Sequence, residues 1–300
     1  MAKVPQQQAP LPVRDGVAPS YLWLPEGSWP DMLSFLAERF PLVSAADWAD
    51  RMARGEVVTG DGLTLRPGSQ FRRGMRIFYY RELERETPIP FEAQILFQDE
   101  HLVVVDKPHF LPMIPSGRFL QETLLVRLKK KLALDDLSPI HRLDRETAGV
   151  VIFSSRQDSR GAYQSLFQKR EVAKVYEALA APLAGRDFPF VYRSRMVEGE
   201  PFFRMREVPG EPNSETLVDV IERRGDAALY RLRPHTGRKH QLRVHMAALG
   251  VPIINDAFYP LALPCKEDDV SQPLQLLARA ISFTDPLTGE ARQFESRRSL

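Results

Sequence analysis

The sequence predicts an α+β protein, in which a mixed, mainly antiparallel sheet with packed helices follows a smaller α+β module. Three observations support this fold class. Strand-like segments are often followed by another strand rather than by a helix, which favours antiparallel neighbours over repeated strand–helix–strand units. A segment containing Pro88 and Pro90 indicates a linker between two parts. Finally, 300 residues with 43% apolar side chains suffice for one large and one small domain.

The first 85 residues are expected to form a tail and a compact module. Residues 1–20 are rich in Pro and Gln and poor in large apolar side chains, which predicts a mobile tail. In the module, residues 21–85, the stretch 55–68 predicts short strands with a hairpin turn at Asp61 and Gly62. Apolar side chains with helical spacing predict two helices, from Met32, Leu33, Leu36 and Phe40 and from Trp48 and Met52.

Residues 86–300 are expected to form the larger domain, in which strand-like and helix-like segments alternate. The last expected helix has Thr236 as a candidate cap at its start and Gly250 at its end. The expected strands are 95–105 with a turn at 98–100, 150–153, 172–179, and a hairpin of 216–221 with 228–232. The expected helices are 122–134, 159–169 and 239–249.

Composition and missing motifs exclude several classes of protein. No run of about 18 apolar residues occurs, and the first residues lack the apolar segment of a signal peptide, so we expect a cytoplasmic protein without a membrane span. The single cysteine, Cys265, excludes an intrachain disulfide and a cysteine-rich zinc site. Phosphate-loop, dinucleotide-binding and HExxH motifs are missing, and the histidines lack metal-ligand spacing. We therefore expect neither a metal nor another cofactor.

Basic side chains gather in clusters, although the net charge is only +2, from 41 basic and 39 acidic residues. Binding of an anionic partner depends on where charges lie and not on their sum, so this balance does not exclude nucleic acid. One run, Lys129–Lys131, fits a solvated helix face instead. The other clusters are Arg72, Arg73 and Arg76; Arg142 and Arg145; Lys169 and Arg170; and Arg238, Lys239 and Arg243.

A polar loop at residues 140–149 leads directly into an apolar strand. In it, Asp144 lies between Arg142 and Arg145, and nearby cations favour the charged form of a carboxyl group. A partly buried, ionised carboxylate can act as a nucleophile or as a general base. The same cluster is also typical of a surface ion-pair network that only stabilises a loop, so spacing alone leaves both interpretations open.

The start of the last expected helix, residues 233–245, is dense in hydrogen-bond donors. Backbone N–H groups at a helix start, together with basic side chains such as Arg238 and Lys239, form a site suited to phosphate. Cations are unfavourable near a helix N-terminus, where the dipole is positive. Their accumulation here therefore favours an anionic ligand over an exposed basic turn.

The loop segment HRLDRETAGVVIF closely resembles the signature loop of the RluA-type pseudouridine synthases. Four further blocks match that family in the same order: ILFQDEHLVVVDKP, KVYEAL, RPHTGRKHQLRVHMAALGVPIIND and LLARAISFTDPLTGE. The resemblance covers about residues 91–300. It implies a catalytic domain with flanking helices and a central RNA-binding cleft. More weakly, residues 31–80 resemble the small S-four-like RNA-binding domain that often precedes such catalytic domains.

The resemblance implies an isomerase that converts selected uridines of structured RNA, ribosomal RNA in the first place and transfer RNA in the second, without a cofactor. Asp144 would be the essential carboxylate, Arg243 its charged partner and Tyr176 the residue that stacks on the flipped base. The protein is expected to act as a monomer. The residues expected to contact RNA are Arg142, Arg145, Arg238, Lys239, His240 and Gln241.

Three positions depart from the family pattern, and two alternative functions remain open. Ala148 stands where the family usually has Ser, Leu277 where His is common, and Asn255 where Gly usually precedes Asp256. None of these changes removes the carboxylate, the tyrosine or the arginine. One alternative is a non-catalytic RNA-binding or assembly protein that retains the fold. The other is a metal-dependent phosphoesterase, which a chelator would inactivate.

Overall fold

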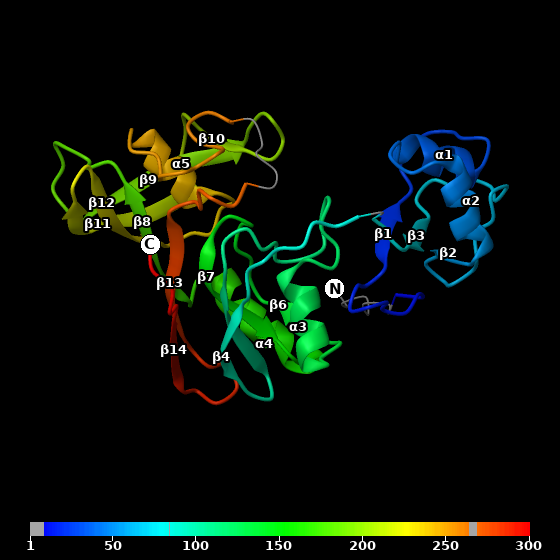
Figure 1. The fold of residues 1–300 in the computed structure, drawn as a ribbon, viewed down its shortest axis with the longest axis horizontal. Helices are drawn as coiled ribbons and strands as arrows, with labels where there is room; N and C mark the ends of the chain where they lie inside the picture. Colours follow the sequence, from blue (N-terminus) through cyan, green and yellow to red (C-terminus); the bar gives the residue numbers. More distant parts are fainter. Residues whose placement is uncertain (1–8, 84, 264–268) are drawn as a thin grey trace. The chain divides into compact units, whose positions relative to one another are not determined.

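The chain folds into two compact units, residues 1–86 and residues 87–300 (Figure 1). The structure, a computed structural model, describes residues 9–83, 85–263 and 269–300. Cys265 and the first part of the expected tail therefore lie outside the described residues. None of the described helices is long and apolar enough to span a membrane.

The small unit packs two helices against one face of a three-stranded antiparallel sheet with the order β1-β3-β2. The helices begin at polar residues whose side chains accept backbone N–H groups, Asp31 for the first and Ser44 for the second. Its core includes Trp48, Phe35 and Ile77. The elements are β1 (Ser20–Trp23), α1 (Met32–Arg39), α2 (Ala45–Ala53), β2 (Val57–Thr59) and β3 (Arg76–Tyr79).

One expectation for the small unit is wrong in part, and another is confirmed. Residues 9–19, expected to belong to a mobile tail, pack on the unit: Arg14 donates to Glu56 at 2.6 Å, and Tyr80 donates to the Pro12 carbonyl at 2.8 Å. The expected hairpin at 55–68 is present but short. Its first arm is β2, and its second arm bonds to β2 through the Thr59 N–H to the Leu63 carbonyl and the Leu65 N–H to the Val57 carbonyl, each at 2.9 Å, while the other edge of β2 pairs with β3.

The large unit is built on one 11-stranded sheet with three helices among the described residues. The helices are α3 (Leu124–Leu132), α4 (Gln157–Lys169) and α5 (Gln241–Ala248). The strands are β4 (Gln94–Gln98), β5 (Leu102–Lys107), β6 (Ser138–Pro139), β7 (Ala148–Ser154), β8 (Ala173–Ala180), β9 (Phe190–Glu198), β10 (Met205–Val208), β11 (Ser214–Arg224), β12 (Ala227–Pro234), β13 (Leu276–Thr284) and β14 (Ala291–Glu295).

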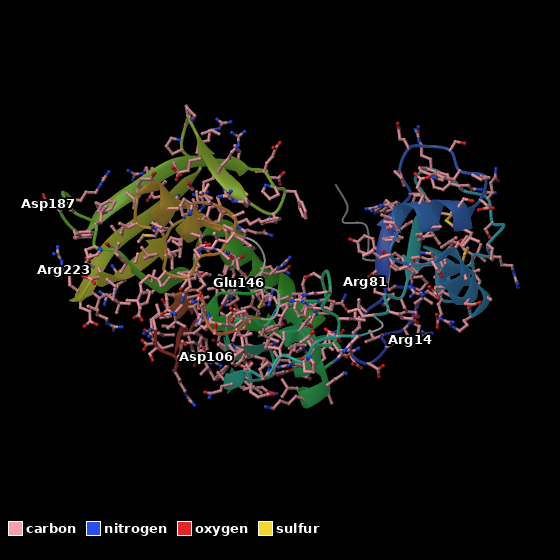
Figure 2. All side chains as sticks on the ribbon, turned by 45° about the horizontal axis from the view of Figure 1, so that its top comes forward. Arg14, Arg81, Asp106, Glu146, Asp187 and Arg223 are labelled. Carbon is pink, nitrogen blue, oxygen red and sulfur yellow. The ribbon has the colours of Figure 1, made fainter. Side chains whose placement is uncertain are left out.

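The sheet is mixed and mainly antiparallel, as the sequence predicts. Its order is β10-β9-β11-β12-β8-β13-β7-β5-β4, with β14 beside β13 and β6 beside β7. Among the described pairings, only β13 with β7 is parallel, and this pairing brings the end of the 140–147 loop into the middle of the sheet. Glu146 of that loop lies well inside the unit, whereas Arg223 at the β11–β12 hairpin lies at its edge (Figure 2).

The start of α5 differs from the sequence prediction. The helix begins at Gln241, and the preceding His240 has a left-handed backbone with φ of 55°. Thr236 does not cap it; the Thr236 hydroxyl donates to the Gln241 side chain at 2.7 Å and accepts the N–H of Glu215 at 2.9 Å. At the other end Gly250 has φ of 82°, so the predicted glycine stop is confirmed. The 236–240 segment is therefore a loop facing the cleft.

Candidate active site

A cleft of about 1340 Å³ crosses the large unit between the 140–147 loop and the segment that precedes α5. Of the described residues that line it, eight are Arg or Lys and only two, Asp144 and Glu146, are acidic. The cleft therefore presents a strongly positive surface although the chain is nearly neutral. The basic residues are Arg118, Arg142, Arg145, Arg170, Lys174, Arg238, Lys239 and Arg243.

Asp144 holds its carboxylate at the wall of this cleft, with 29% of the side chain exposed. Its Oδ2 lies 3.4 Å from Nη1 of Arg243 and 3.7 Å from Nε2 of His240. Asp144 and Arg243 are 99 residues apart in the chain, so the fold brings together the two basic segments that the sequence singles out. A partly exposed carboxylate with one charged and one imidazole neighbour can react with a bound substrate.

Arg243 makes its closest contacts with Asp256. Its Nε and Nη2 donate to the two Asp256 oxygens at 2.8 and 2.6 Å, and both side chains are 1% exposed. Although burial opposes the charge of Arg243, the hydrogen bonds to Asp256 raise the pKa of its guanidinium. The two hydrogen bonds to Asp256 thus fix the orientation of the guanidinium, and its third nitrogen, Nη1, faces Asp144.

Tyr176 lies in β8, at the centre of the sheet, and lines the same cleft. It pairs with Leu232 on one side and with Ala278 on the other. Burial raises the pKa of Tyr176, and the negative charge of Asp144 acts in the same direction. The tyrosine is therefore a neutral phenol, and its ring can stack on a planar base while its hydroxyl remains available to donate a proton.

The loop that carries Asp144 is anchored by buried polar groups. The ammonium group of Lys107, 0% exposed, donates to the carbonyls of Pro108, Leu111 and Arg145, each at 2.9 Å. Burial lowers the pKa of Lys107 to about 7. At the start of the loop, Nε2 of His141 accepts the backbone N–H of Ile152 at 3.2 Å. These contacts hold the loop backbone on both sides of Asp144.

His240 is a neutral neighbour of Asp144. Burial lowers the pKa of His240 to about 4, even though the charge of Asp144 opposes the shift. Its Nδ1 lies 2.9 Å from the hydroxyl of Tyr259, and that oxygen accepts the N–H of Met205 at 2.8 Å. In the tautomer with its proton on Nε2, the imidazole accepts the Tyr259 hydroxyl at Nδ1 and presents its N–H to Asp144.

The other residues expected to contact RNA are in different environments. Arg142, Arg238 and Lys239 are exposed along the cleft, although Arg238 also donates to the Asn213 carbonyl at 3.1 Å. Arg145 is partly buried, with its guanidinium 5.0 Å from the centre of the Phe119 ring. Gln241 is 4% exposed, and both ends of its amide are bonded inside the protein. Its side chain therefore shapes the loop and is not free for a ligand.

The three departures from the family pattern have a structural context. Ala148 and Leu277 are register partners in the parallel β7–β13 pair, and both are 0% exposed. The positions where Ser and His are expected are therefore neighbours, and an apolar pair occupies them here. Asn255 has φ of 64°, in the left-handed region that Gly adopts freely and Asn tolerates better than most residues. Asn can thus replace Gly before Asp256.

Asp256 and Lys107 are the functional neighbours that sequence reasoning missed. Both stand in blocks that the family resemblance covers, but neither has a local pattern that indicates a site. Lys107 follows a buried apolar strand, and Asp256 follows a Pro-containing loop. Only their positions beside Arg243 and beside the Asp144 loop reveal what they do.

Comparisons with known proteins identify related sequences. A family model described as RNA pseudouridylate synthase matches residues 101–248. The dual-specificity RNA pseudouridine synthase RluA of Haemophilus influenzae is 32% identical over 219 residues, which cover 72% of this chain and 97% of that protein. An uncharacterised RNA pseudouridine synthase of Aquifex aeolicus is 28% identical over 298 residues, covering 90% of each chain.

Solved structures agree as well. The structure of human RNA pseudouridylate synthase domain containing 4 superposes with a TM-score of 0.53 and 28% identity, covering 68% of this chain and 87% of that one. Among the relatives matched by sequence, the dual-specificity RNA pseudouridine synthase RluA of Salmonella typhi is 34% identical over 211 residues, which cover 91% of that protein. With the signature loop in the cleft and these relatives, the chain belongs to the RluA-type RNA pseudouridine synthases.

Proposed function

We propose that this protein isomerises selected uridines of structured RNA to pseudouridine, with Asp144 as the essential carboxylate. The observation that carries this proposal is the position of Asp144, which is exposed in a cationic cleft between Arg243 and His240. Phosphate groups of RNA suit the exposed basic side chains of the cleft, such as Arg142, Arg238 and Lys239. The family to which the chain belongs performs this reaction.

The reaction rearranges one nucleoside without any net redox change. The bond from uracil N1 to ribose C1′ breaks, and a bond from uracil C5 to C1′ forms. The hydrogen on C5 leaves as a proton, and N1 takes up a proton. Attack on the anomeric carbon, attack on the base and removal of a sugar proton all require a carboxylate, and the structure holds the guanidinium of Arg243 3.4 Å from that of Asp144.

The remaining residues of the cleft place the base. A uridine within a helix cannot reach Asp144, so it must leave the stack at a cost of about a few kcal/mol. Tyr176 offers an aromatic face against which the extruded uracil can stack. Its hydroxyl stays protonated and can exchange a proton with the base late in the reaction. Arg142, exposed on the same loop, can contact the RNA backbone or fill the vacated position.

We favour ribosomal RNA as the substrate, with transfer RNA as the second candidate. The chain has a second folded unit besides the one that holds the cleft, and a large folded RNA offers contacts for both. The cleft is formed by residues of one chain, so a monomer suffices, and we place the protein in the cytoplasm. Mapping pseudouridines in both RNA pools of cells that lack the gene identifies the substrate: a site lost only from transfer RNA would contradict our preference.

We further propose that the small unit is an S-four-like RNA-binding module. In support, the Aquifex relative aligns over 90% of this chain, an alignment too long to be confined to residues 87–300. The Haemophilus relative, by contrast, is covered over 97% of its own length but aligns with only 72% of this chain. We therefore expect a chain starting at Thr87 to unfold cooperatively and to retain turnover with a raised KM. Loss of cooperative unfolding would show that the two units share a core.

The decisive test is Asp144→Asn, a change that keeps size and removes the charge. Pseudouridine formation releases the hydrogen of C5, so RNA labelled with tritium at uridine C5 reports turnover. We expect the variant to fold and bind RNA like the wild type, but to release no tritium. As a matched control, Glu146→Gln removes the other carboxylate of the same cleft and should retain turnover. Near-normal tritium release by Asp144→Asn would disprove the proposal.

A further inference from the structure

The three-stranded sheet of the small unit has one face that no helix covers. In an antiparallel pair, register partners point to the same side of the sheet, and alternate residues of a strand share a face. Tyr21 pairs with Phe78, and Trp23 pairs with Arg76, so these four side chains lie on one face. The helices pack on the opposite face, against Ile77 and its neighbours.

Two aromatic rings on the uncovered face are unusually exposed. Trp23 is 59% exposed and Tyr21 is 57% exposed. Phe78 of the central strand β3 lies on the same face but is buried, with the guanidinium of Arg76 over its ring. Apolar rings of this size gain free energy when they are covered, so an exposed pair on a flat sheet marks a contact surface. We call Tyr21, Trp23, Arg76 and Phe78 the aromatic platform.

Arg76 supplies a charge in the middle of this platform. Its guanidinium carbon lies 4.2 Å from the ring centre of Tyr21, 4.6 Å from that of Phe78 and 5.7 Å from that of Trp23. Its Nε is buried and has no hydrogen-bond partner within the described residues. A guanidinium held among aromatic rings can stack on bases and attract phosphate, a property that a purely apolar docking partner would not use.

The chain around the platform is also complementary to an anionic partner. Residues 62–81 contain five arginines and no Asp or Glu. One of these arginines, Arg73, pairs with Glu26 at 3.0 Å. Aromatic rings interleaved with arginine on an exposed sheet are the arrangement that holds single-stranded nucleic acid, because the rings stack bases and the cations neutralise phosphates.

We propose that the aromatic platform binds unpaired bases of the RNA substrate by stacking them on Tyr21 and Trp23, with Arg76 against the backbone. This surface is separate from the cleft that holds the reacting uridine. The proposal rests on the proposed function only in that the protein acts on RNA. The platform raises affinity for RNA that has an unpaired segment, and it takes no part in the isomerisation itself.

The test measures binding of the full chain to an oligoadenylate of about 12 nucleotides, a length within the range that stacking surfaces occupy. This probe contains no uridine and therefore no substrate base. Trp23→Ala and Tyr21→Ala should each raise the Kd at least about fivefold, which corresponds to stacking of about 1 kcal/mol or more. Trp23→Phe keeps an aromatic face and should retain most of the affinity.

A matched control and a second readout separate the platform from the active site. Leu42→Ala removes a fully exposed apolar side chain from the same unit, outside the platform, and should leave the Kd unchanged. In the tritium-release assay, Trp23→Ala should raise KM and leave kcat unchanged. If the wild type released no tritium, the proposed function would fail, while oligoadenylate binding would still report on the platform.

Two results would contradict the proposal that the aromatic platform binds RNA. One is wild-type affinity for oligoadenylate in both alanine variants, or an equal loss in Leu42→Ala. The other is concentration-dependent self-association in sedimentation that Trp23→Ala abolishes without any change in RNA affinity. That second result would make the face a contact between two copies of this chain.

Discussion

At the scale of single residues, the site depends on one arginine shared by two carboxylates. Arg243 is bonded twice to the buried Asp256 and once, at the longer distance of 3.4 Å, to the partly exposed Asp144. The shorter bonds fix the orientation of the guanidinium, so its remaining nitrogen, Nη1, faces Asp144 without moving. Asp256 therefore positions the guanidinium beside Asp144, the carboxylate that we propose to react.

Replacing Arg243 by Met should affect stability and turnover together. The variant leaves Asp256 buried and unpaired, and breaking a buried ion pair from one side costs about 3–5 kcal/mol of unfolding free energy. Adding Asp256→Asn removes that unpaired charge, so the double variant should regain stability in urea unfolding. It should not regain tritium release, because Asp144 still lacks its cation. Recovery of turnover in the double variant would show that Arg243 acts through stability alone.

At the scale of elements, the Asp144 loop is held by a close approach between two strands. Gly149 in β7 has φ of 114°, and a Cβ at this position would lie 2.2 Å from the carbonyl oxygen of Ala278 in β13. Only glycine allows the parallel β7–β13 pairing to bring the loop against the sheet. The loop geometry therefore depends on backbone contact as well as on its polar side chains.

Gly149→Ala should destabilise the large unit by about 3 kcal/mol or more, because the backbone clash and the unfavourable φ act together. Gly161 provides the matched control. It lies in the interior of α4, with no atom within 4 Å of an added Cβ, so Gly161→Ala should stabilise the protein by about 0.5–1 kcal/mol. Chemical unfolding of both variants measures the difference. Equal effects would mean that the β7–β13 approach can relax.

At the scale of the whole molecule, three histidines of the large unit are buried in their neutral form. Burial lowers the pKa of His141 to about 3, and the charge of Lys174 lowers it further. Burial likewise lowers the pKa of His240 and of His245 to about 4. Each side chain has an internal partner, such as the Ile152 N–H for His141 and the Ser214 hydroxyl for His245. The fold is therefore linked to pH through these groups.

Stability should fall as the pH is lowered from about 7 to about 4.5. In the unfolded chain these histidines bind protons below about pH 6.5, whereas in the folded chain they resist protonation until about pH 4 or lower. Each pH unit of this difference is worth about 1.4 kcal/mol per histidine. Urea unfolding across this range tests the expectation. His141→Gln should show a smaller loss on acidification, and an unchanged loss would exclude His141 as a contributor.

The sequence by itself predicted many of the elements, although not β9 and β10, and it singled out the loop that carries Asp144. Apolar spacing places α3 and α4, and the turn at Gly225 separates β11 from β12, because such patterns depend on neighbours along the chain. The signature loop identifies Asp144 through residues that are contiguous in the chain. The start of α5 at Gln241, by contrast, could not be predicted. The hydroxyl of Thr236 does not cap the helix because it accepts the N–H of Glu215, which lies in the distant strand β11.

Tertiary structure decided which distant residues meet. Asp256 meets Arg243, and Lys107 meets the carbonyl of Arg145, only because the fold brings distant parts of the chain together. The exposure of Tyr21 and Trp23 depends on which face of β1 the helices cover, and β1 reaches its partner β3 across more than 50 residues. Periodicity along a chain encodes local conformation. Contacts between distant segments depend on strand order and register, which no local pattern contains.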